Sequence, residues 1–262
     1  MLIVVIVITE CSCQKTSMVP NVSGATAFTV VNAVPNTVNG IAPIINTSQA
    51  IMWFGYIYPI IGYGNFQEYS PVGGMDTVYT VQYNSQDTLD VGPKATGKIF
   101  YSILNLEKGG IYTLFLSGSD TTSPDYLFIK DSVPYYPTSD SVMGIRFVNL
   151  STGSGPISIN LEGSPNGSEV SSLTYKGITG FKQYPNNSTT LDYFFVIRDA
   201  ATGDSLTQFD FNLVGDTNNG YGLADFQYTG DLLTFKNITI ALIGQPGLNA
   251  VVPQSTMIIN NF

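Results

Sequence analysis

The 262-residue chain contains no histidine and few charged residues. Without an imidazole, this chain by itself supplies no Ser-His-Asp triad, no Cys-His pair and no His-ligated metal centre. Ten basic and nineteen acidic side chains give a net charge of −9, and phosphate contacts need clustered Lys and Arg, so the chain lacks the surface that nucleic acid requires. The charged fraction is only 11%, against about 25% in average soluble domains, and this composition excludes a coiled coil.

The carboxylates also give no sign of a catalytic site. After the N-terminal segment the only glutamates are Glu68, Glu107, Glu162 and Glu169, and no spacing suggests a catalytic pair. A pair of facing carboxylates for glycoside hydrolysis depends on tertiary geometry and stays open at this point. Residues 216–220 offer oxygen ligands beside a turn glycine but miss the spacing of an EF-hand loop. We expect no enzymatic activity, no cofactor and no metal ion.

Both cysteines of the chain lie near its start, at Cys11 and Cys13. Residues 1–8 form an apolar run that is far shorter than the roughly 20 residues of a membrane span but matches the h-region of a secretory signal. Ser12 before Cys13 resembles the cleavage site of a bacterial lipoprotein, which predicts a signal segment over 1–13 and lipidation of Cys13. Residues 14–25 are polar and predict a flexible tether. The alternative is that residues 1–8 form a buried N-terminal strand.

The remainder of the chain has the pattern of a β protein. Residues 157–162 and 209–213 alternate between apolar and polar side chains, which predicts strands with one buried and one solvated face. Residues 238–243 are apolar on both faces and predict a central strand. Turn-forming clusters at 164–167 and 199–204 separate such runs, and no long segment has a helical period. Many short strands with frequent turns indicate a sandwich or a barrel.

An internal repeat divides the chain in two. Residues 28–32 correspond to 145–149, and residues 66–71, 78–81 and 112–118 have counterparts in the same order further along. The offset of about 117 residues is the size of one immunoglobulin-like sandwich. Proline-rich residues 134–139 are the expected boundary. We therefore predict an all-β protein of two tandem antiparallel immunoglobulin-like β-sandwich domains, over residues 26–134 and 140–262.

The repeat motifs resemble those of Bacteroidetes-type lipoproteins that carry domain-of-unknown-function family 4397. Residues 145–151 read I-R-F-V-N-L-S, residues 175–184 begin and end with tyrosine, and residues 109–118 read G-G-I-Y-T-L-F-L-S-G. The resemblance covers the chain from about residue 25 to its end. It implies an exported, envelope-anchored β-sandwich protein and carries over no active-site residue.

Six Asp-Ser or Asp-Thr pairs followed by an aliphatic residue or threonine resemble the O-glycosylation motif of exported Bacteroidetes proteins. The candidate acceptors are Thr77, Thr88, Thr121, Ser132, Ser141 and Ser205. A glycan there would be bulky and restricted to the surface. The alternative is that Asp-Ser and Asp-Thr are common at strand ends in a β protein rich in hydroxyl side chains.

The densest aromatic cluster surrounds the single tryptophan. Trp53, Tyr56 and Tyr58 are candidate ligand contacts, because exposed aromatic rings stack on sugars and often mark a binding surface. The alternative is that Trp53 fills the core between two sheets.

Together these features predict a lipid-anchored protein of the cell envelope, at the periplasmic face or the cell surface of the outer membrane. Its expected role is non-catalytic adhesion, scaffolding or binding. Its expected contacts are the membrane through the lipid, a glycan or an outer-membrane protein, and other copies of itself. One alternative is an accessory glycan-binding subunit of an outer-membrane uptake complex. Another is a filament subunit assembled by strand exchange through an unpaired terminal strand at residues 257–260.

Overall fold

A computed structural model of the chain confirms that the protein is all-β. Each of the fifteen regular elements in the described part of the chain is a β-strand. In that part, no helix has the length and apolarity to span a membrane. The structure describes residues 26–35, 37, 40–45, 60–71, 74–82, 98–119, 124–137, 140–186, 192–212, 237–247, 250 and 252–261.

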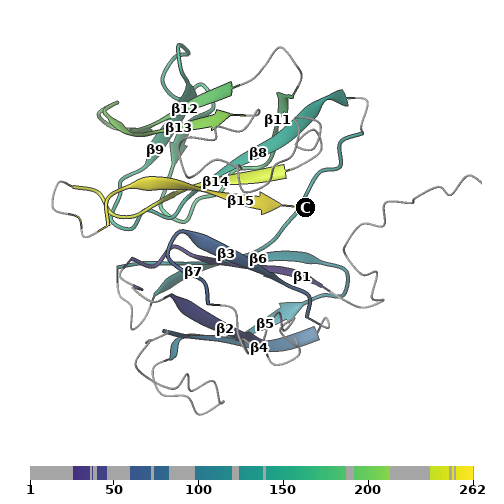
Figure 1. Cartoon of the computed structure of the whole chain (residues 1–262). Helices are drawn as coiled ribbons and strands as arrows, with labels where there is room; N and C mark the ends of the chain where they lie inside the picture. Colours follow the sequence, from purple (N-terminus) through teal and green to yellow (C-terminus); the bar gives the residue numbers. More distant parts are fainter. Residues whose placement is uncertain are drawn as a thin grey trace, which may run out of the picture.

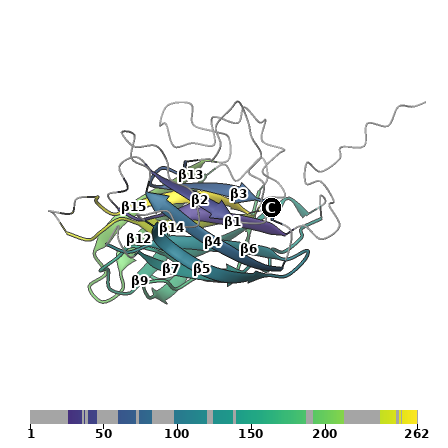
Figure 2. The same ribbon diagram turned by 90° about the horizontal axis from the view of Figure 1, so that it is seen from below.

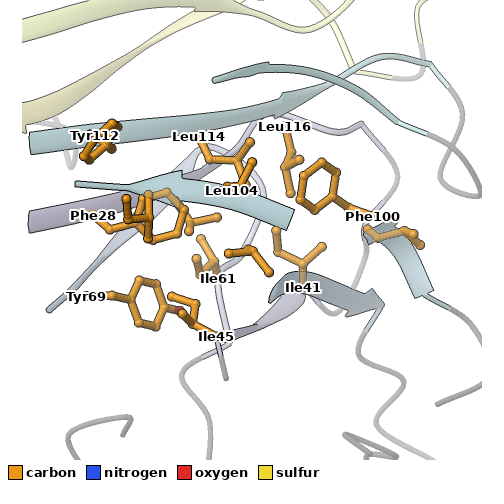
Figure 3. Close-up of a cluster of buried hydrophobic side chains, with 14 of the residues drawn as sticks. Phe28, Ile41, Ile45, Ile61, Tyr69, Phe100, Leu104, Tyr112, Leu114 and Leu116 are labelled. Atoms are coloured by element: carbon orange, nitrogen blue, oxygen red, sulfur yellow. The ribbon is translucent and has the colours of Figure 1, made fainter. Parts of the chain in front are cut away.

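The first half of the chain forms a sandwich of two sheets (Figure 1). Its outer sheet has the strand order β2 (Ile41–Ile45), β4 (Gly74–Gln82), β5 (Lys98–Leu106). Its inner sheet has the order β3 (Asn65–Tyr69), β1 (Ala27–Asn32), β6 (Ile111–Ser117), β7 (Asp125–Lys130). Phe28, Ile41, Leu104 and Leu114 are among the side chains that meet between these sheets and form the first core (Figure 3).

The second half repeats this plan. Its inner sheet has the order β11 (Lys182–Pro185), β8 (Val142–Asn149), β14 (Asn237–Ile243), β15 (Ser255–Asn261). Its outer sheet has the order β10 (Val170–Leu173), β9 (Ile157–Leu161), β12 (Asp192–Asp199), β13 (Ser205–Asn212). Phe147, Ile159, Phe195 and Ile240 lie in the second core between them.

Strand pairing confirms the internal repeat. The order β3-β1-β6-β7 returns as β11-β8-β14-β15, and β2-β4-β5 returns as β9-β12-β13 with β10 added at one edge. The register is also kept between the first and the penultimate strand of each half. Phe28 lies opposite Tyr112 in the first half, and their sequence counterparts Ile145 and Ile238 lie opposite each other in the second.

The expectation of purely antiparallel sheets is wrong at one place in each half. β1 and β6 run parallel, as do β8 and β14, whereas all other paired strands are antiparallel. The parallel pair arises because the first strand of each half inserts beside a strand that returns from the other sheet. Parallel neighbours need a long connection, which the intervening strands provide. The immunoglobulin-like assignment stays a prediction.

The apolar faces of β14 are both covered, as its sequence predicts. All seven of its residues are buried. Ile238, Ile240 and Leu242 belong to the second core, whereas Ala241 and Ile243 point the other way into a third cluster. That third cluster lies between the two inner sheets, so the four sheets form one stack (Figure 1). The sheets overlap when the molecule is seen from below (Figure 2).

We call this third cluster the inter-sandwich seam. Its buried members come from both halves of the chain: Val31, Ala33, Phe115, Val148, Leu150, Ala241, Ile243, Met257 and Ile259. Phe115 and Ile259 are fully buried there. Sheets that pack face to face keep apolar side chains between them, so the two sandwiches meet over an apolar interface and not only at a linker.

The solvated face predicted for residues 157–162 is largely buried. Ser158 and Asn160 on that face of β9 are 6% and 2% exposed. β9 lies between β10 and β12, and the Asn160 amide donates to the carbonyl oxygens of Leu161 and Ser164 at 2.9 and 3.3 Å. Local hydrogen bonds satisfy this polar side chain, so an alternating pattern does not require contact with water.

A buried asparagine ends the first strand of each half. Asn32 and Asn149 are both fully buried. Each accepts a hydrogen bond at 3.1 Å from the backbone N–H two residues further on, and donates from Nδ2 to a distant carbonyl oxygen, that of Ile61 or of Leu173. The repeated asparagine of the sequence motif therefore fixes the turn that leaves the strand.

The terminal strand of the described chain is paired. β15 pairs with β14 over its whole length, from Asn261 opposite Asn237 to Ser255 opposite Ile243. Its side chains Met257 and Ile259 are buried in the seam. An unpaired strand at residues 257–260 would have favoured the filament hypothesis, and the structure instead shows this strand paired with β14.

Candidate functional site

A buried ion pair joins the two halves of the chain beside the seam. Asp131 directly follows β7, and Arg146 lies in β8. Arg146 Nη1 and Asp131 Oδ1 are 2.5 Å apart, and the two side chains are 5% and 0% exposed. A buried charge without a counter-charge destabilises the folded state, so the stability of the fold depends on having both residues.

Hydroxyl groups from both inner sheets extend the ion pair. Thr113 Oγ1 of β6 donates to Asp131 Oδ2 at 2.6 Å, and Arg146 Nε donates to Thr239 Oγ1 of β14 at 2.7 Å. Thr239 donates in turn to Asn261 of β15. The guanidinium carbon lies 4.6 Å from the ring centre of Phe181. Burial lowers the pKa of the Arg146 guanidinium, and the charge of Asp131 opposes that shift.

The joint between the halves is also held in place. Asn237 Nδ2 donates to the carbonyl oxygen of Pro134 at 2.8 Å, and Tyr136 is buried. Gly144 of β8 lies so close to this contact that a Cβ atom there would be 2.0 Å from Asn237 Oδ1. The Pro-rich segment therefore packs on the second sandwich and does not behave as a loose linker in this structure.

A second polar cluster lies at one rim of the seam, where loops of both sandwiches meet. Tyr175, in the loop between β10 and β11, brings its hydroxyl to 2.9 Å from Ser117 Oγ and 3.2 Å from Asp125 Oδ2 of the first sandwich. Thr152 Oγ1 donates to the same tyrosine oxygen at 3.1 Å. Lys176 Nζ is 3.3 Å from Asp125 Oδ1. We call these five residues the rim cluster.

A shallow, open hollow adjoins the rim cluster. Its lining comes from three loops of both sandwiches: Ser119, Thr152, Gly153, Gln245, Pro246, Gly247 and Ala250. None of these side chains is charged. They offer two hydroxyls, one primary amide, a proline ring and accessible backbone, which together can donate and accept hydrogen bonds with a neutral polar ligand.

Several residues predicted as functional lie outside the described residues. They are Cys13, Trp53, Tyr56, Tyr58, Thr88 and Thr121. Thr77 belongs to the middle strand β4, where it pairs with Ile103, and its side chain is outside the description. Lipidation of Cys13 and ligand contact at the Trp53 cluster stay predictions.

Three glycosylation candidates can be placed. Ser132 in the joint and Ser205 at the start of β13 are exposed. Ser141 is half-buried and has a φ of 44°, and its carbonyl oxygen accepts a hydrogen bond from Asn186. Exposure is what a surface glycan requires, so Ser132 and Ser205 are the more accessible acceptors. The aspartate before Ser132 is the one buried against Arg146.

Four carboxylates in the described part of the chain each form an ion pair with a lysine or an arginine. Glu107 contacts Lys130, Asp125 contacts Lys176, Asp131 contacts Arg146 and Glu169 contacts Lys182. In the described part of the chain, no group of three or more acidic or cysteine side chains is placed to hold a metal ion. Each of these four carboxylates therefore has a structural partner.

Neither the ion pair nor the rim cluster was predicted from the sequence. Arg146 is a single charge inside an otherwise apolar strand, which is a signal that a buried partner exists. The identity of that partner depends on how the two halves pack, since Asp131 belongs to the other side of the joint. Tyr175 carried no such signal, because tyrosines are common throughout this chain.

Comparison with known proteins adds little to this description. No family model matches the chain, and no curated protein matches it. Among solved structures, a candidate adhesin from Bacteroides ovatus aligns with 91% of this chain and 95% of its own, at 11% identity and a TM-score of 0.23. Neither the identity nor the TM-score is high enough to indicate a shared fold.

Proposed function

We propose that the protein is an exported, lipid-anchored module of the cell envelope that binds a partner without catalysing a reaction. The proposal joins the lipoprotein-like start of the sequence, with Cys13 as the anchor and residues 14–25 as the tether, to the all-β stack. Family 4397 lipoproteins are the class whose motifs the chain resembles. In this proposal the protein lies at the outer membrane, on its periplasmic face or at the cell surface.

The observation that carries the proposal is the hollow at the rim of the seam. Loops from both sandwiches line it, while the seam and the Asp131–Arg146 pair hold the two sandwiches in a fixed relation. Binding sites on loops gain affinity when a rigid scaffold positions those loops, because less conformational entropy is lost on binding. A rigid stack in which loops of both sandwiches line one hollow is suited to adhesion or to ligand recognition.

A neutral glycan is the ligand class that the lining favours. The hydroxyl of Ser119 and the amide of Gln245 can both donate and accept hydrogen bonds, as sugar hydroxyls do. The hydroxyl of Thr152 donates to Tyr175 and can accept a hydrogen bond from a ligand. The proline ring of Pro246 adds an apolar surface. The net charge of −9 disfavours an anionic ligand at long range. This chemistry supports the second candidate function, an accessory glycan-binding subunit of an uptake complex.

A glycan array tests binding at the hollow. We expect the full chain to retain neutral oligosaccharides, and Gln245→Ala to weaken retention about tenfold through the loss of one or two hydrogen bonds. Gln208→Ala is the matched control, because Gln208 is an exposed glutamine on β13, away from the hollow. Binding that is equally strong in both variants would place the ligand elsewhere, and no retention of any glycan would remove this ligand class.

Mass spectrometry of the protein from its native membrane tests the anchor. We expect the chain to begin at Cys13 with acyl chains attached, because stable attachment needs more than one chain. The same spectra report glycans at Ser132 and Ser205. Cys13→Ser should release the protein from the membrane fraction, whereas Cys11→Ser should not. An unmodified Cys13 that still follows residues 1–12 would contradict the anchor.

A further inference from the structure

The outer sheet of the first sandwich ends in a strand whose outward side chains are large and apolar. β5 is an edge strand of that sheet in the described structure, and residues 99–106 contain no charge and no proline. Its outward side chains Tyr101 and Ile103 are 59% and 57% exposed. Natural sheets usually protect such edges with charges, prolines or bulges, because an open edge accepts another strand. In β5 a charge and a register shift occur only at the start, at Lys98 and between Lys98 and Phe100, and residues 100–106 pair with β4 in regular register.

The second half of the chain shows that the fold does not require this apolar edge. β13 occupies the position of β5 and pairs with β12 as β5 pairs with β4. Tyr79, opposite Tyr101, corresponds in the repeat to Phe194, which lies opposite Asp210. The equivalent of Tyr101 is therefore Asp210, and by the same register the equivalent of Ile103 is Asn212. One edge carries an acid and an amide where the other carries large apolar side chains.

We propose that β5 is a self-association surface, at which two copies of the chain pair edge to edge. The two β5 strands run antiparallel about a two-fold axis at Ser102, which extends the outer sheet across both copies. Isologous contact of this kind is the commonest way in which identical chains associate. The proposal does not depend on the anchor or on the hollow.

A second copy suits this edge because the strand is complementary to itself. In an antiparallel pair centred on Ser102, Tyr101 of each copy lies opposite Ile103 of the other on the outer face. Phe100 lies opposite Leu104 on the core face, where both side chains already belong to the first core. Aromatic and β-branched residues are favourable cross-strand partners.

Light scattering of the full chain over a concentration series tests self-association. We expect the molar mass to rise toward twice that of one chain. The double variant Tyr101→Lys and Ile103→Lys should stay monomeric, because it puts charges on the edge in both copies. Phe194→Lys is the control, since it adds a lysine on the outer sheet of the second sandwich, where Phe194 is 41% exposed, and should still dimerise. Circular dichroism checks that each variant is folded.

A cysteine placed on the expected two-fold axis tests the register. In the chain with Cys11→Ser and Cys13→Ser, Ser102→Cys should form a disulfide-linked dimer under mild oxidation, because directly opposed strand residues are about 4.5–5.5 Å apart between Cα atoms. Asn105→Cys in the same background lies opposite Ile99 of the other copy and should cross-link several-fold less. A chain that is monomeric at every concentration overturns the proposal, as does dimerisation that the lysine variant leaves unchanged or equal cross-linking at both positions.

Discussion

Replacing Asp131 with alanine is expected to lower the free energy of unfolding by about 3–5 kcal/mol, because the guanidinium of Arg146 stays buried without its counter-charge. The Arg146 side chain is only 5% exposed, so water cannot take the place of the carboxylate without opening the seam. Thr113 Oγ1 also loses the acceptor that lies 2.6 Å away. Unfolding in guanidinium chloride, followed by circular dichroism, measures the loss.

Two further variants separate the charge effect from a general loss of packing. Lys130→Ala is the matched control, since Lys130 is the preceding residue and its ion pair with Glu107 is exposed on both sides. Exposed pairs contribute about 0–1 kcal/mol, so little stability should be lost. The double change Asp131→Leu with Arg146→Met removes both charges and should recover most of the stability. A loss below 1 kcal/mol in Asp131→Ala would contradict a buried, mutually dependent pair.

The second large effect is expected in the seam. Phe115→Ala should cost about 3–5 kcal/mol, because Phe115 is fully buried and its removal leaves a cavity between two inner sheets. The seam also predicts that the two sandwiches unfold together, since neither can expose its inner sheet without exposing apolar side chains of the other. Calorimetry should show one transition for the unmodified protein, with the calorimetric and van't Hoff enthalpies equal.

Tyr135→Ala supplies the comparison for this experiment. Tyr135 is 86% exposed in the joint, so truncation there should change stability by less than about 0.5 kcal/mol. Two separate transitions in the unmodified protein, or a Phe115→Ala variant as stable as Tyr135→Ala, would show that the sandwiches are independent domains and that the seam contributes little.

The local pattern of side chains was sufficient to predict the all-β class and the internal repeat. Alternating and two-sided apolar runs predicted strands, and the two-sided run at 238–243 correctly marked a strand that is covered on both faces. The turn at 199–204 was also correct, with Gly203 at a φ of 79° and Asp199 Oδ1 accepting from the backbone N–H groups of Ala201 and Thr202. These features depend on neighbours within a few residues, which a sequence shows directly.

Features that depend on distant neighbours were not predictable in this way. The burial of Asn160 depends on β10 and β12, and the parallel pairing of β8 with β14 depends on how the chain returns between sheets. The same holds for the rim cluster, in which Tyr175 meets Asp125 across 50 residues of sequence. A single sequence gives the strand propensity of each segment, but it does not show which strands become neighbours in a sheet.

By itself, therefore, the sequence determined that the chain lacks histidine chemistry, and it predicted a β protein that repeats one plan twice. The tertiary structure decided that the two copies share a third apolar core and that Asp131 and Arg146 are partners across it. The physical reason is that burial belongs to the assembled sheets: a side chain that could face water on an isolated strand becomes interior only when a second sheet covers it.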